Sequence, residues 1–62
     1  MPNILEMRVE QKRDLSILLR IKKHNPGIKI ERLQEEINYQ VQIMEPEDVA
    51  YVEKLAGVKA ID

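Results

Sequence analysis

The sequence predicts an all-α protein: a helical hairpin of about residues 3–24 and 28–44, followed by a short third helix at about residues 46–56. Two observations support this fold class. The chain-breaking Pro and Gly residues are few and fall between these segments. Within the segments, apolar residues recur mostly at the spacing of an amphipathic helix. We expect residues 1–62 to form a single small helical domain, and two copies to form a dimeric helix bundle.

The first segment carries the end signals of a helix. Asn3 with Glu6 three residues later resembles a capping box, in which the two side chains satisfy free backbone N–H groups of the first turn. The second half of the segment is strongly apolar. Lys22, Lys23 and His24 then suit the negative end of the helix dipole. These signals favour one long helix.

Residues 4–10 also fit a β-strand, and this alternative stays open at the level of the sequence. Leu5, Met7 and Val9 alternate with charged residues, which is the two-residue period of a strand. A lone strand is not stable, so a strand here requires a partner. That partner would lie near residues 28–30 or in a second chain.

The middle segment has the clearest helical pattern. Ile30, Leu33, Ile37, Val41 and Met44 recur at helical spacing and form one apolar stripe. Three of them, Ile30, Ile37 and Met44, are seven residues apart, as in a heptad seam. A helix with such a stripe buries it against a neighbour.

The third segment has clear start and stop signals. Pro46 suits the first helical position, where a missing N–H costs nothing. Glu47 and Asp48 follow in the first turn, where the helix dipole favours negative charge. Gly57 ends the segment in the usual position after a helix, with Val58 placed to pack back on it.

The Asn25-Pro26-Gly27 turn lets the first two helices fold back on each other. Their apolar stripes then share one interface, which is the core of the chain or the seam of an oligomer. The residues predicted to form this seam are Leu15, Leu18, Ile21, Ile30, Leu33, Ile37, Val41 and Met44.

The same alignment places a polar layer, Gln11, Asp14 and Gln40, inside the hairpin. Buried polar groups destabilise a fold unless each finds a partner, and their best-attested use is to fix register or oligomeric state. Two interpretations stay open. Either the glutamines specify the pairing of a dimer, or this end of the bundle is hydrated.

The composition favours self-association. A chain of 62 residues has a marginal core, and small folds usually gain stability from disulfides, a metal or oligomerisation. The sequence has no Cys, one His, no Phe and no Trp, so disulfides, a His-rich or thiolate metal site and an aromatic core are excluded. We therefore expect a homo-oligomer, with a dimer favoured.

The charges are divided between the two halves of the chain. Residues 1–29 hold seven Lys and Arg against three acidic residues, whereas residues 30–62 hold three against eight. We favour neutralisation of one half by the other within the chain or dimer. The alternative is a basic, phosphate-binding face on the first helix. Its predicted residues are Lys12, Arg13, Arg20 and Lys23.

Tyr39 and Ile43 lie off the main apolar stripe of the middle helix. Left exposed, they would form a second contact surface for a partner. If the third helix folds over that side, it buries them instead. The sequence does not decide between these arrangements.

No pattern in the sequence resembles an active site. Ser16 and His24 are about two helical turns apart, and the chain has no Thr and no Cys. The acidic clusters match no calcium loop, and two Gly thirty residues apart cannot form a phosphate loop. We predict no enzymatic activity, no metal and no cofactor. Neither a membrane-length apolar run nor a signal-peptide pattern is present, which predicts a cytoplasmic protein without membrane contact.

Together these features predict a small non-catalytic interaction module or regulator that associates with itself and binds another protein. The alternative is a small nucleic-acid-binding regulator that uses the basic face of the first helix. However, the acidic residues of the second and third helices do not suit a DNA recognition helix.

Overall fold

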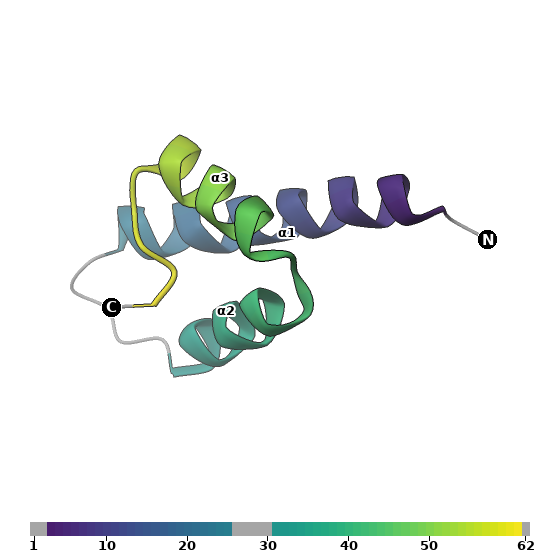
Figure 1. Ribbon diagram of the computed structural model, residues 1–62. Coiled ribbons are helices and arrows are strands. Elements are labelled where there is room, and N and C mark those ends of the chain that lie inside the picture. The colour runs from purple at the N-terminus through teal and green to yellow at the C-terminus, as the bar shows by residue number, and fades with distance from the viewer. Residues whose placement is uncertain (1–2, 26–30, 62) are drawn as a thin grey trace.

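The computed structural model describes residues 3–25 and 31–61, which contain three helices and no strand: α1 (Ile4–His24), α2 (Glu31–Ile43) and α3 (Pro46–Ala56) (Figure 1). The prediction of an all-helical chain is confirmed for these residues. The molecule measures 39 × 21 × 15 Å, and α1 runs along its length. α1 is the common partner of the two shorter helices, since both pack against it.

α1 begins at the predicted cap. The Asn3 side chain accepts a hydrogen bond from the Glu6 N–H at 2.8 Å. The strand alternative for residues 4–10 is wrong, because these residues are helical. Their strand-like alternation carries no information about a buried face. This part of α1 extends past the other two helices (Figure 1), and Leu5 and Val9 are exposed.

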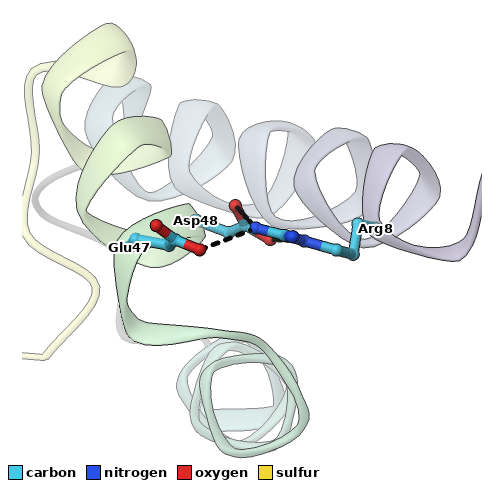
Figure 2. Close-up of polar contacts among 3 residues, drawn as sticks. All are labelled: Arg8, Glu47 and Asp48. Atoms are coloured by element: carbon cyan, nitrogen blue, oxygen red, sulfur yellow. Dashed lines mark hydrogen bonds and ion pairs between the residues drawn. The ribbon is translucent and has the colours of Figure 1, made fainter. Parts of the chain in front are cut away.

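α2 crosses α1 steeply. Figure 2 looks almost along α2 while α1 runs across the view, so the two helices do not lie side by side as in a long antiparallel hairpin. The described part of α2 begins at Glu31, and residues 28–30, predicted to open this helix, lie outside the described residues. Ile37 and Gln40 are buried on the side of α2 that faces α1, and Met44 is buried just after the helix ends.

α3 has the predicted ends. Pro46 occupies the start of the helix, and Gly57 ends it in the left-handed conformation, with φ 72° and its N–H donated to the Glu53 carbonyl at 2.9 Å. α3 runs in the same direction as α1 (Figure 1). Near its end, Lys23 Nζ of α1 donates a hydrogen bond to the Ala56 carbonyl at 3.1 Å.

The core lies where the two shorter helices meet α1. Each helix contributes to it, as does the segment after α3. Its buried residues are Leu15, Leu19, Ile37, Met44, Val52 and Ala60, with Leu18, Leu33, Val41, Val49, Ala56 and Val58 packed against them.

The segment after α3 ties all three helices together at Ala60. The Ala60 carbonyl accepts hydrogen bonds from Lys22 Nζ of α1 at 3.3 Å and from Gln34 Nε2 of α2 at 2.9 Å. Its N–H donates to Glu53 Oε2 of α3 at 2.7 Å. Because Ala60 is almost completely buried, these bonds satisfy backbone groups that water does not reach.

Candidate interaction surface

The face of α1 that meets the other helices is apolar only in its centre. Arg8, Lys12, Leu15, Leu19 and Lys22 follow one another at steps of four and three residues, and all are buried or half-buried. The two leucines contact the core, whereas the three cationic residues lie toward the ends. Each of these long side chains combines an apolar stem with a charged head, which suits a position at the edge of a small core.

Arg8 forms the strongest polar contact between α1 and α3 (Figure 2). Its Nε and Nη2 donate to the two carboxylate oxygens of Asp48 at 2.8 and 2.9 Å, and Nη2 also donates to Glu47 Oε1 at 2.9 Å. A fork of this kind is among the strongest hydrogen-bonded charge pairs. The hydrogen bond from Arg8 lowers the pKa of Asp48, although burial opposes this, and the carboxylate in turn raises the pKa of Arg8. Asp48, only 5% exposed, therefore stays charged in the fold.

Two of the four residues predicted to bind phosphate turn toward α3. Lys12 Nζ lies 5.5 Å from the centre of the Tyr51 ring, a cation–π contact. Lys23 donates to the Ala56 carbonyl at the end of α3. The other two, Arg13 and Arg20, are exposed and form no ion pair with residues 3–25 or 31–61.

The predicted seam residues fall into three groups. Some are buried or half-buried in the core described above: Leu15, Leu18, Leu33, Ile37, Val41 and Met44. Ile21 is 38% exposed and lies outside the core, because Leu19 and Lys22 occupy the inward positions of that turn. Ile30 lies outside the described residues.

The structure brings together two of the three residues of the predicted polar layer. Gln40 is buried, and its Nε2 donates to the Gln11 carbonyl at 3.4 Å. Asp14 is exposed instead, because α1 turns it away from α2.

Tyr39 and Ile43 remain on the surface. Tyr39 is 62% exposed and Ile43 is 46% exposed, because α3 packs on α1 and does not cover this side of α2. Tyr39 and Ile61 border an open hollow on the surface. α3 therefore does not bury Tyr39 and Ile43.

α1 also carries an apolar row outside the stripe that packs against its partners, and this row winds partly round the helix. Leu5, Val9, Ile17 and Ile21 succeed one another at multiples of four residues and are 71, 53, 49 and 38% exposed. Arg13 fills the remaining step of this row. Leu5, Val9 and Arg13 border an open hollow on the N-terminal half of the helix. The outer row of α1 is defined as these five residues.

Sequence reasoning missed the outer row and the Arg8–Asp48 pair. A search for residues four apart outside the main stripe would have found the row, because its spacing is regular. The ion pair joins residues 40 positions apart, so no local pattern encodes it. One local sign was present. Arg8, Lys12 and Lys22 fall at helical spacing with the buried leucines of α1, so their charged heads need acidic or carbonyl partners.

The described residues contain no group of three or more His, Cys, Asp or Glu side chains placed to bind a metal ion. Ser16 is half-buried and His24 is exposed. Among the described helices, none has the length and apolar character needed to cross a membrane. Comparison with known proteins finds no matching family model, no matching curated protein and no matching solved structure.

Proposed function

We propose that this chain is a non-catalytic interaction module that associates with itself and presents a further surface to another protein. The observation that carries the proposal is the surface area of the single chain. It exposes 5013 Å², whereas a compact monomer of 7.3 kDa is expected to expose roughly 4,200 Å². A chain that exposes more surface than a compact monomer can bury the surplus against a partner.

The nature of the exposed side chains supports the same proposal. The described residues leave large apolar side chains on every helix at least 38% exposed, including Ile4 and Leu5 on α1, Tyr39 on α2 and Leu55 on α3. Single exposed apolar residues are ordinary, but rows and pairs of them are typical of contact surfaces. A second copy would supply the burial that a chain without Phe or Trp lacks.

Sedimentation equilibrium over a wide concentration range tests self-association. We expect the average mass to rise from that of one chain to that of two as the protein concentration increases. A mass of 7.3 kDa at every concentration would contradict the proposal.

The surface around Tyr39 and Ile43 is the proposed site for the protein partner. Its position on α2, away from α1, leaves it free while the chain associates through another face. A pull-down from the native host with wild-type protein and with the Tyr39→Ser/Ile43→Ser variant tests this. We expect the variant to keep the wild-type helical content and oligomeric state but lose the partner; equal capture by both proteins would rule out this site.

A nucleic-acid-binding regulator is the second candidate, favoured by the exposure of Arg13 and Arg20. The turn of Lys12 and Lys23 toward α3 weakens it, because fewer charges remain for phosphate. A phosphate-binding mode predicts affinity for RNA or DNA that falls steeply with added salt. Absence of binding at low salt would eliminate this candidate.

A further inference from the structure

We propose that a second copy of this chain docks on the outer row of α1, with the two α1 helices antiparallel and related by a two-fold axis near Arg13. This inference rests on the proposed self-association and names its surface. The same surface must serve both chains, because a two-fold interface is self-complementary.

The spacing of the outer row suits helix-to-helix packing. Leu5, Val9, Arg13, Ile17 and Ile21 form an unbroken row of residues four apart. Such rows form ridges, and ridges of this type from two helices interlock at the commonest crossing angle of globular proteins, about −50°. The row follows the line of contact in that arrangement, so all four of its apolar side chains reach the partner.

The charges beside the row decide the direction of the partner. Glu6 and Glu10 are exposed on the N-terminal half of α1, whereas Arg20 is exposed on the C-terminal half. A parallel pair would set each of these charged residues against its own copy. An antiparallel pair sets the acidic half of each helix against the basic half of the other, which favours the correct register and disfavours the wrong one.

An axis at Arg13 matches apolar residues with apolar residues. Leu5 of one chain then faces Ile21 of the second copy, and Val9 faces Ile17. The same register sets Glu6 opposite Arg20. Arg13 is the best position in the row for the two-fold axis. With the axis one turn away, at Val9 or Ile17, Arg13 would face an apolar side chain of the second copy.

Arg13 is the unfavourable element of this interface. The two Arg13 side chains approach each other at the axis, although each has an acidic residue, Glu10, one turn away on its own helix. Replacing this residue should therefore strengthen the dimer. Unfolding of α1 would remove this interface, so a tighter dimer that keeps the wild-type helical content and a mass of two chains is not the result of misfolding, which makes Arg13 a useful position for a test.

Disulfide trapping tests the axis directly, because the native chain has no Cys. In Arg13→Cys, the two introduced thiols meet at the axis, within the Cα separation of about 4.4–6.8 Å that a disulfide allows. We expect a covalent dimer after mild oxidation. Val9→Cys alone should not cross-link, since its two copies lie about 12 Å apart along the helices, but a mixture of Val9→Cys and Ile17→Cys should. A parallel dimer would instead cross-link Val9→Cys with itself.

Affinity measurements on uncrosslinked variants complete the test. We expect Ile17→Glu to raise the dimer Kd about tenfold or more, and Arg13→Leu to lower it about tenfold. Tyr39→Glu, an equally drastic change on the exposed side of α2, is the matched control and should leave the Kd unchanged. Circular dichroism verifies that each variant keeps the wild-type helical content.

The outcomes separate this inference from the proposed function. If the wild-type chain is monomeric at every concentration and Arg13→Cys gives no covalent dimer, both fail. If the wild-type chain dimerises but Tyr39→Glu breaks the dimer while Ile17→Glu and Arg13→Leu leave it unchanged, self-association stands and the α1 surface is wrong.

Discussion

The two halves of α1 are built from similar side chains in opposite surroundings. In the N-terminal half, Leu5 and Val9 are more than half exposed, whereas Leu15 and Leu19 in the C-terminal half have no exposed surface. One cause is the face of α1 on which each residue lies, since Ile17 and Ile21 in the C-terminal half are also exposed. The other cause is the length of the helices. α1 has 21 residues and spans about 31 Å, whereas α2 and α3, with 13 and 11 residues, span about 20 and 16 Å. The shorter helices cannot cover α1 from end to end.

This difference indicates that α1 has two roles, one in the fold of its own chain and one in contact with a partner. The C-terminal half organises the fold of its own chain, and Arg8 fastens the N-terminal half to α3 by its charge pair. The apolar side chains that remain uncovered are available to a partner. The comparison yields predictions that separate stability of the chain from association between chains.

The largest effect is expected from shortening a buried side chain in the C-terminal half of α1. Leu15→Ala should lower the free energy of unfolding by about 2–5 kcal/mol, because it opens a cavity at a fully buried site. Leu5→Ala removes the same atoms from an exposed site and should change it by less than about 0.5 kcal/mol. Urea unfolding at a dilution that keeps the chain monomeric measures both. Equal losses of unfolding free energy in the two variants would contradict the conclusion that Leu15 belongs to the core and Leu5 does not.

A smaller loss is expected from Arg8→Met, which removes the tie between the N-terminal half of α1 and α3. The change leaves the nearly buried Asp48 carboxylate without its guanidinium partner. The urea midpoint should fall, and adding Asp48→Leu should recover part of the fall. Arg13→Met, at an exposed arginine of the same helix, is the control. If both single variants unfold at the same urea concentration, the pair does not stabilise the fold.

The same pair predicts a dependence on pH. Because Arg8 lowers the pKa of Asp48 in the fold, the unfolded chain binds the proton more readily than the folded one. The stabilisation is therefore complete above the unfolded pKa, about 3.9, and is lost as the pH falls through the lower folded value. Thermal unfolding of wild type and Asp48→Asn should differ at pH 7, and the difference should narrow as the pH is lowered below about 3.9. A difference in thermal stability that does not change with pH would mean that the Arg8–Asp48 pair does not stabilise the fold.

The smallest effect is expected at the exposed end of α1. Asn3→Ala removes the acceptor of the Glu6 N–H and should cost about 1 kcal/mol, confined to the first turn. Asn3→Asp keeps an acceptor and should behave as wild type. Hydrogen exchange at the Glu6 amide measures the change. Unchanged exchange in Asn3→Ala would mean that the cap does not hold this turn.

The elements that local chemistry encodes could be predicted from the sequence. Asn3, Pro46 and Gly57 each act within one helical turn, so their roles follow from neighbouring residues alone. The apolar stripe of α2 likewise predicts that Ile37 and Met44 are buried.

The arrangement of the helices could not be predicted in the same way. Nothing in the local pattern of α3 shows that it packs on α1 and leaves Tyr39 exposed, since its short apolar face fits either neighbour. The Ala60 contacts were missed because they join backbone groups to Lys22, Gln34 and Glu53, and a backbone acceptor has no sequence signature. Leu19 was left out of the seam because the predicted hairpin gave Ile21 its place.

Hydrogen exchange as a function of protein concentration tests the central claim most directly, namely that α1 uses one face for its own chain and the other for a second copy. We predict that amides around Leu15 and Leu19 are protected at every concentration. Amides of residues 8–10 should exchange quickly at dilution and become protected as the dimer forms. Protection of residues 8–10 that does not change with concentration would contradict the account.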